Sequence, residues 1–178
     1  MGVLLIAPLA HGGETAQWPS RPVRFLMAAP AGSSIDVLGR VLAERLREAL
    51  GQPFVVESMP GAGGTLAIAA LARAPADGHT IAIGFNGPLA FAPFLYARLP
   101  YDPQHDLEPV VLTTSQPNVL AVAATLPVYS VPELIAHARA RPGQLNYASV
   151  GNGSSSHLSM ELMRSMARIE ITHVPYNG

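Results

Sequence analysis

The sequence predicts an α/β fold, because short apolar runs with strand character alternate with segments of helical periodicity. In the helical segments apolar residues recur every three to four positions, whereas the strand-like runs are short and continuous, as in buried parallel strands. The joints between them are rich in glycine, serine and proline, which favour turns. The chain has 178 residues, 49% of them hydrophobic and 13% charged. That length suits one domain or two small lobes.

Five strands and five helices follow from these patterns. The expected strands span residues 23–29, 54–57, 80–85, 145–149 and 169–174. The expected helices span residues 37–50, 65–74, 89–95, 130–141 and 158–167. Two of them begin at capping-box pairs, Ser33 with Asp36 and Ser130 with Glu133. The repeated strand–loop–helix order predicts mainly parallel sheets flanked by helices.

The chain is expected to cross between two lobes. Residues 110–114 and 119–123 are two extended segments on either side of Gln116–Pro117, which predicts the crossing there. We therefore divide the chain into a leader or tail at residues 1–17, a first lobe at 18–110 and an incomplete second lobe at 111–178. The last strand has no helix after it to cover it, so the sequence predicts a truncated α/β protein.

Composition excludes several classes of function. A formal net charge of −1 and a pI near 6.6 leave no excess of positive charge for nucleic-acid phosphates. The chain has no cysteine, and all eleven basic residues are arginine. Disulfides, cysteine-based metal sites, a P-loop lysine and a lysine Schiff base are thereby excluded.

The N-terminal residues indicate export. Val3–Ala10 is an apolar run with the length of the hydrophobic region of a secretory signal, and it is too short to span a membrane. Ala10 and Gly12 provide a small-x-small cleavage site, although no basic segment precedes the run. The alternative is an ordinary hydrophobic first strand.

Four loops at the carboxyl ends of expected strands are candidate ligand contacts, and each leads into a helix. They are Ala31–Ser34, Pro60–Thr65, Asn86–Pro88 and Gly151–Ser156. Ligands bind at this edge of open α/β sheets, and helix N-termini with free N–H groups favour anions. Serine hydroxyls in the first and last loops add neutral donors. The alternative for any one loop is that it only caps a helix.

Other chemistries find weaker support in the sequence. The glycines of Gly61–Gly64 lack the G-x-G-x-x-G spacing of a dinucleotide site, and the histidines lack metal-ligand spacing. Ser154 and His157 could suggest a nucleophile and its base, but no G-x-S-x-G elbow surrounds the serine, which is better explained as an N-cap. Asp36 either caps its helix or reaches into the cleft. We expect no catalytic residue, no metal and no cofactor.

Several short motifs, taken together in their order along the chain, resemble a known family, although no single motif would do so. In chain order the motifs are Trp18–Val23, Ala31–Gly32 with Asp36, Glu44–Pro53, Pro60–Gly64, Ala74–Gly78, Leu99–Pro103, Leu145–Ser149, Gly151–Ser154 with His157–Leu158, and His173–Tyr176. Together they resemble the extracytoplasmic solute-binding receptors of tripartite tricarboxylate transporters, the Bug family. The resemblance covers Trp18 to Gly178.

The resemblance implies a type II periplasmic-binding-protein fold, in which two lobes close on a small carboxylate. The ligand would be a dicarboxylate, a tricarboxylate or an acidic amino acid, captured in the periplasm and handed to membrane permease subunits without catalysis. One wall of the cleft would comprise Ala31, Gly32, Ser33, Ser34, Asp36, Asn86 and Gly87. The other would comprise Gly153, Ser154, Ser155 and His157, with Tyr176 beginning a further cleft segment.

Three departures from the family pattern bear on this expectation. Ser33–Ile35 replaces a stretch that usually resembles Gly-Pro-Thr, and Asn177 stands where lysine is common. Family members also extend well beyond the end of this chain. Two alternatives therefore stay open: a nucleotide-using α/β enzyme, suggested by the glycine-rich loops, and a non-functional fragment of the receptor.

Overall fold

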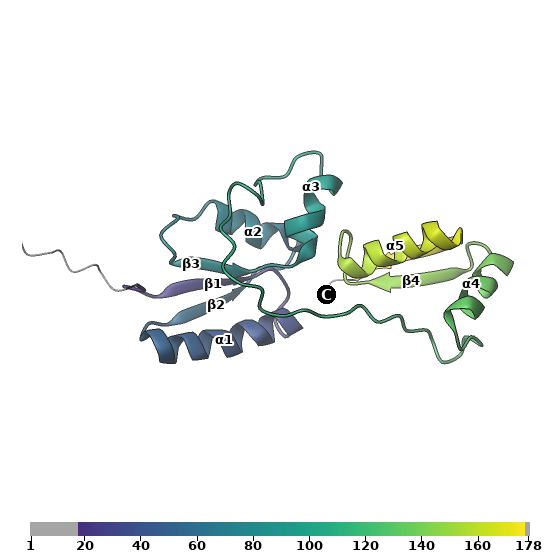
Figure 1. Ribbon diagram of the computed structural model, residues 1–178, viewed down its shortest axis with the longest axis horizontal. Helices are drawn as coiled ribbons and strands as arrows, with labels where there is room; N and C mark the ends of the chain where they lie inside the picture. Colours follow the sequence, from purple (N-terminus) through teal and green to yellow (C-terminus); the bar gives the residue numbers. More distant parts are fainter. Residues whose placement is uncertain (1–17, 177–178) are drawn as a thin grey trace, which may run out of the picture.

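Two parallel β-sheets, each with its own helices, make up the computed structural model, which describes residues 18–176 (Figure 1). The first sheet contains β1 (Val23–Met27), β2 (Phe54–Ser58) and β3 (Thr80–Ile83). Its strand order is β2-β1-β3, with β1 parallel to both neighbours. The predicted α/β fold with parallel sheets is confirmed.

Helices cover both faces of the first sheet (Figure 1). Helix α1 (Ser34–Leu50) packs its apolar stripe on one face, over Phe25, Met27 and Phe54. Helix α2 (Thr65–Ala72) packs on the other face, where Ile68 is almost completely buried. Gly39 permits the close approach of α1, because a Cβ there would overlap the Met27 side chain. A largely apolar strand such as β1, in which only Arg24 is exposed, fits between two helical layers.

Short helical turns complete this first lobe. They are the 3-10 turn η1 (Ala62–Gly64), the π-helical turn η2 (Gly87–Phe91) and helix α3 (Ala92–Leu95). Tyr101, which follows them, is buried against Ile68 and donates a hydrogen bond from its hydroxyl to the Pro88 carbonyl at 2.7 Å. This bond anchors η2 to the loop after α3.

The second lobe is a smaller unit of the same strand–helix type. It contains α4 (Val131–Ala140), β4 (Leu145–Ser149), α5 (Ser155–Ala167) and β5 (Ile171–Pro175), with β4 and β5 paired in parallel. Its core gathers Ala138, Tyr147 and Ile171. The guanidinium of Arg139 donates two bonds to the Ala167 carbonyl at 3.1 and 2.6 Å, which ties α4 to the end of α5.

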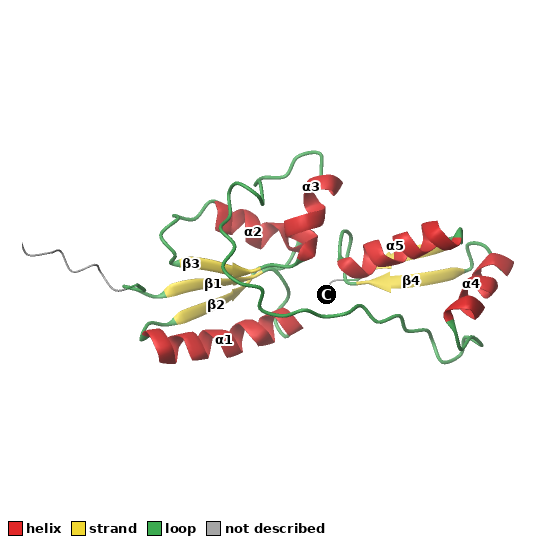
Figure 2. Cartoon of the chain, viewed as in Figure 1, coloured by secondary structure: helices red, strands yellow, loops and turns green. Residues whose placement is uncertain are grey.

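A long segment without helix or strand, residues 96–130, joins the two lobes (Figure 2). The segments expected to be extended, 110–114 and 119–123, lie in it, and they are not paired with the described strands. Val110 is 87% exposed there. Asn118 is fastened to α5, because its amide group donates to Ser159 Oγ at 3.0 Å and accepts from Ser155 Oγ at 3.3 Å. The lobe boundary between residues 110 and 111 stays a prediction.

The boundaries differ most where helices begin. Helices α1 and α5 begin at Ser34 and Ser155, directly after the N-caps Ser33 and Ser154 that the sequence predicted, and three residues before the apolar periodicity of each helix begins. Apolar periodicity misses such a first turn, because its side chains face solvent or the loop rather than the core. The apolar run at Val3–Ala10, the cleavage site at Ala10 and Gly12, and Asn177 lie outside the described residues.

Candidate ligand-binding cleft

The carboxyl ends of both sheets face the space between the lobes (Figure 1). The loops after β1, β2 and β3 lie at the end of the first lobe nearest the second, and the loop after β4 lies at the end of the second lobe nearest the first. Helices α1 and α5 begin at this space. Their N-termini therefore contribute N–H groups and partial positive charge to the same region.

The loop after β1 is fastened by a buried carboxylate. Asp36 is 2% exposed and accepts hydrogen bonds from the Gly32 N–H at 2.9 Å, from Ser58 Oγ at 2.7 Å and from the Arg40 guanidinium at 3.0 and 3.1 Å. The Asp36 N–H donates to the Ser33 hydroxyl at 3.3 Å. The bond from Arg40, and then those from Gly32 and Ser58, hold the pKa of Asp36 well below its usual range.

The residues of the loop after β1 have different roles. The carboxylate of Asp36 is satisfied by protein donors, so the structure gives it the role of holding the loop in shape. The residues around the N-terminus of α1 are mostly exposed, namely Ala31, Gly32 and Ser34. Ser33, the N-cap of the helix, is half-buried. Gly32 adopts a φ of 82°, a left-handed conformation that favours glycine.

The loop after β3 leads into η2. Asn86 is exposed and Gly87 is buried. The hydroxyl of Tyr101 holds this turn through the Pro88 carbonyl, and burial raises the pKa of Tyr101 to about 12, so the phenol stays protonated and able to donate.

The loop after β4 is held by its own serines and histidine. Ser154, which is 4% exposed, donates from its hydroxyl to the Gly151 carbonyl at 2.7 Å and accepts from the His157 N–H at 3.2 Å. The Gly153 N–H donates to His157 Nδ1 at 3.2 Å. The ring nitrogen of His157 thus faces the loop backbone, and the hydroxyl of Ser154 is engaged as a cap rather than as a nucleophile.

The two lobes approach each other through glycines. A Cβ added to Gly63 would lie 3.1 Å from the Asn152 carbonyl, and one added to Gly87 would lie 3.4 Å from the Gly153 carbonyl. A Cβ on Gly153 would lie 2.9 Å from Leu95 Cδ1. The cavity that these residues border is too narrow in this arrangement of the lobes to hold a water molecule. Backbone from both lobes therefore lines the gap, and a side chain at any of these glycines would obstruct it.

Two of the residues predicted from the sequence meet in this cavity, Gly87 from the first lobe and Gly153 from the second. The cavity is also lined by residues outside the two predicted walls, namely Ala62, Gly63, Thr65, Ala92, Leu95, Tyr96 and Asn152. Four of them, Ala62, Gly63, Thr65 and Asn152, belong to the Pro60–Thr65 and Gly151–Ser156 loops, which the sequence marked as candidate ligand contacts. Nothing in the sequence pattern marks Leu95 and Tyr96, because only the tertiary structure brings the end of α3 to this gap.

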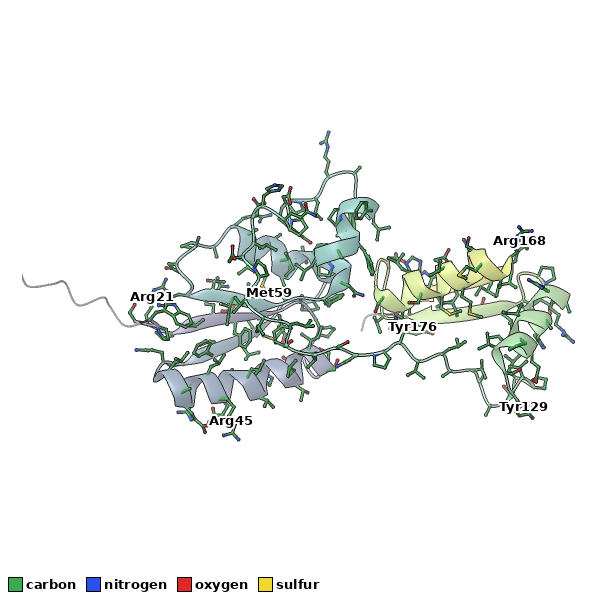
Figure 3. The ribbon with its side chains drawn as sticks, viewed as in Figure 1. Arg21, Arg45, Met59, Tyr129, Arg168 and Tyr176 are labelled. Atoms are coloured by element: carbon green, nitrogen blue, oxygen red, sulfur yellow. The ribbon has the colours of Figure 1, made fainter. Side chains whose placement is uncertain are left out.

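Tyr176 lies at the end of the second lobe nearest the first (Figure 3). Its N–H donates to the Ser149 carbonyl at 3.0 Å, and its side chain is 62% exposed. The carbonyl of Tyr176 would lie 3.5 Å from a Cβ on Gly151. Its backbone therefore borders the second-lobe loop. Tyr129 and Arg168 lie toward the opposite end of that lobe (Figure 3).

The described residues offer no metal centre: nowhere in 18–176 do three or more histidine, aspartate or glutamate side chains gather as metal ligands. No helix in the same range is long and apolar enough to cross a membrane. What the region offers instead is a set of backbone N–H groups and hydroxyls around two helix N-termini. Such donors suit an anion bound without a local ion pair.

Comparison with known proteins decides the family. Residues 38–178 match the tripartite tricarboxylate transporter family receptor, TctC. The chain belongs to this family. Members of the TctC family are solute-binding receptors rather than enzymes, so the prediction that the chain is not an enzyme is confirmed, and the nucleotide-enzyme alternative loses its support.

Relatives of known sequence or structure agree with this assignment. Protein BugT of Bordetella pertussis is 38% identical over 162 residues, which cover 90% of this chain and 50% of BugT. Rpa4515 of R. palustris, solved with adipate, is 42% identical with a TM-score of 0.84 over 90% of this chain and 54% of its own. MatC of Rhodopseudomonas palustris, solved with bound malate, is 34% identical with a TM-score of 0.81 over 90% of this chain and 55% of its own.

The chain spans about half the length of the relatives that it matches. The predicted resemblance to an N-terminal portion of a TctC receptor is confirmed, as is the periplasmic-binding-protein fold class. The individual cleft residues stay predictions.

Proposed function

We propose that this chain forms the ligand-capturing loops of a periplasmic receptor that binds a small carboxylate and delivers it to the permease subunits of a tripartite transporter. One observation carries the proposal: the N-termini of α1 and α5 begin at the same gap between the lobes, at the carboxyl ends of both sheets. A dicarboxylate placed there would receive hydrogen bonds from both lobes. The relatives solved with adipate and malate support the same ligand class.

The first wall in this proposal is the exposed N-terminal end of α1 together with the loop after β3. Ala31 and Ser34 offer backbone and hydroxyl donors. Gly32 lies between them with its N–H bonded to Asp36, and Ser33 and Asp36 hold the geometry of the loop. Asn86 adds an exposed amide beside the buried Gly87. None of these residues is charged except Asp36, whose carboxylate is already satisfied. Recognition at this wall therefore rests on neutral donors and the helix dipole.

The second wall is the Gly151–Ser156 loop. Gly153 lines the cavity directly, and Ser154, Ser155 and His157 fix the first turn of α5. Tyr176 extends the wall through its exposed phenol. Glycine at position 153 matters because a Cβ there would push against Leu95 across the gap.

A thermal melt of the 178-residue chain with a panel of carboxylates tests the ligand class. The panel contains acetate, malate, adipate, citrate and glutamate, with glucose as a neutral control. A ligand at about a hundred times its dissociation constant adds roughly 2.7 kcal/mol to the folded state. We expect one di- or tricarboxylate or acidic amino acid to raise the midpoint while glucose leaves it unchanged. A cooperative melt that no carboxylate shifts would contradict the proposal, and the absence of any transition would favour the fragment alternative.

A pair of glycine variants tests the position of the site. Gly153→Ala and Gly143→Ala both place a Cβ at a left-handed residue, with φ of 76° and 72°. Gly143 has open space around it, whereas Gly153 faces Leu95 across the gap. Both variants should lose about 1–2 kcal/mol of stability, but only Gly153→Ala should lose the carboxylate-induced shift. Equal ligand shifts in the two variants would place the site elsewhere.

The periplasmic location of this chain rests on its family and on the apolar Val3–Ala10 run. Fusing residues 1–17 to a reporter enzyme that is active only after export tests it. Export of the reporter is the expected result, and its loss after Leu5→Arg would assign the signal to the apolar run, because a charge interrupts the hydrophobic region. A reporter that stays in the cytoplasm would contradict the location.

A further inference from the structure

The three longest helices begin with the same pair of hydrogen bonds. In each, a serine N-cap accepts from the N–H three residues later, and the side chain at that third position accepts from the N–H of the residue before the cap. In α1 the acceptor is the Asp36 carboxylate, bonded by Gly32 at 2.9 Å. In α4 it is the Glu133 carboxylate, bonded by Tyr129 at 2.8 Å. This arrangement satisfies N–H groups that a helix leaves without partners.

Helix α5 uses a histidine where the other two use a carboxylate. His157 Nδ1 accepts from the Gly153 N–H at 3.2 Å, and the His157 N–H donates to the Ser154 hydroxyl at 3.2 Å. A carboxylate keeps its acceptor capacity at any pH above about 5, but an imidazole nitrogen accepts only while it carries no proton. Protonation of His157 would turn Nδ1 into a donor facing the donor of Gly153.

A second histidine supports the other side of the same loop. His173, on β5, stacks on His157 with ring centroids 4.1 Å apart and an interplanar angle of 19°. Its Nε2 lies 2.6 Å from the hydroxyl oxygen of Ser149, which accepts from the Gly151 N–H at 3.1 Å. His157 therefore bonds the Gly153 N–H directly, whereas His173 is linked to the Gly151 N–H through the Ser149 hydroxyl.

The surroundings of this pair favour an uncharged His173 ring. The groups that face it are Tyr147 on β4, stacked on His173 at 4.8 Å, and Glu161 on the next turn of α5. The Glu161 carboxylate is already bonded by the Tyr147 hydroxyl at 2.5 Å and by Arg164 at 2.7 Å. Burial lowers the pKa of His173 and the neighbouring His157 lowers it further, while Glu161 acts in the opposite direction.

We propose that His157 and His173 are positioning residues for the Gly151–Ser154 loop, and that His157 holds the loop in its ligand-binding shape only while its ring is neutral. The consequence for binding rests on the function proposed above. Acidification then releases the Gly153 N–H, loosens the second wall and weakens carboxylate binding. For a single linked proton the affinity falls with decreasing pH, by about tenfold for each pH unit once that proton is bound.

Nuclear magnetic resonance of the ligand-free chain tests the structural half of the proposal. Long-range proton–nitrogen spectra of the imidazoles should show His157 with a bare Nδ1 and a protonated Nε2 near neutral pH, about 7.5. The Gly153 amide resonance should titrate with the His157 ring. A His157 proton on Nδ1, or a Gly153 amide that does not move while His157 titrates, would overturn it.

Three variants provide the matched comparison in binding. His157→Gln replaces the imidazole with an amide oxygen that accepts at every pH and is common at this position of capping boxes. His157→Ala removes the acceptor, and His105→Gln changes an exposed histidine far from the loop, with a side chain 77% exposed. The dissociation constants of adipate and malate are measured by calorimetry from about pH 7.5 to 5.

The wild type and His105→Gln should lose affinity about tenfold or more over this range. His157→Gln should show a flat profile, and His157→Ala should bind weakly at every pH. A His157→Gln profile as steep as the wild type would overturn the positioning role. If neither acid binds to the wild type at any pH, the proposed function fails and so does the claimed effect on affinity, while the ring spectra still decide whether His157 caps the loop.

Discussion

Single polar side chains hold the candidate loops in place, and each is satisfied inside the protein. Asp36 fastens the first loop through Gly32 and Ser58, Tyr101 fastens η2 through Pro88, and His157 fastens the second-lobe loop through Gly153. Buried polar groups of this kind stabilise a fold only when their partners are present. The loops thus have their shape before a ligand binds. A substitution at one of these residues should therefore lower the free energy of unfolding as well as the ligand affinity.

Asp36 should make the stability of the first lobe depend on acid pH. Because the pKa of Asp36 is lower in the folded chain than in the unfolded chain, its contribution is fully present above the unfolded value near 3.9 and is lost as pH falls through the folded value. Asp36→Asn should therefore be less stable than the wild type at neutral pH, with a difference that shrinks below about pH 4. Urea unfolding at a series of pH values measures this difference, with Glu108→Gln as an exposed control. A stability difference between Asp36→Asn and the wild type that stays constant below about pH 4 would contradict this prediction.

Tyr101→Phe should remove one buried hydrogen bond and leave the Pro88 carbonyl without its partner. We expect a loss of about 1–2 kcal/mol in the free energy of unfolding. Tyr129→Phe is the matched control, because that tyrosine is 92% exposed, and it should change stability by less than about 0.5 kcal/mol. Equal effects in urea melts of the two variants would show that the Tyr101 hydroxyl contributes nothing specific.

At the scale of elements, helix ends and tight turns rather than helix interiors shape the candidate site. The capping pairs at Ser33 and Ser130 were predictable from sequence, because their spacing has a physical cause in the free N–H groups of a helix start. The equivalent at Ser154 was predicted only as an N-cap. Its partner His157 does not match the usual capping pattern, which has Glu or Gln at this position. Histidine can replace them there only while its ring is neutral and can accept a hydrogen bond.

The turn between β2 and α2 needs glycine for two separate reasons. Gly64 has a φ of 89°, and a Cβ there would lie 2.9 Å from the Phe85 ring and 3.0 Å from the Ala28 carbonyl. Gly51 ends α1 with a φ of 75° and open space around it. Gly51→Ala should cost about 1–2 kcal/mol for the backbone alone, and Gly64→Ala should cost roughly 1–3 kcal/mol more because of the added contacts. Thermal melts of the pair compare them, and equal losses would refute the steric part.

At the scale of the whole molecule, the cores of the two lobes are separate. The first lobe buries Phe25, Met27 and Ile68 around its three-stranded sheet, and the second buries Tyr147 and Ile171 around its two strands. The contacts between lobes run through the glycines of the gap and through the segment 96–130. Such sparse contact suits lobes that move relative to one another when a ligand binds.

Separate cores should respond separately to cavity-forming substitutions. Ile68→Ala should destabilise the first lobe by about 2–5 kcal/mol, and Ile171→Ala should do the same in the second. Hydrogen exchange followed by mass spectrometry should then show faster exchange in β1 and β3 for the first variant and in β4 and β5 for the second. Faster exchange across the whole chain in both variants would show instead that the lobes unfold as one unit.

The sequence by itself determined the alternation of strands and helices, the parallel sheets, the family and the loops most suited to an anion. It could do so because apolar periodicity, caps and turn residues are local consequences of burial and of unpaired N–H groups. Only the tertiary structure decided that Gly63, Leu95 and Asn152 share a cavity with Gly87 and Gly153, that Asp36 accepts a hydrogen bond from Ser58, and that His173 stacks on His157. These facts depend on contacts between segments far apart in the chain, and such contacts leave no periodic signal in a single sequence.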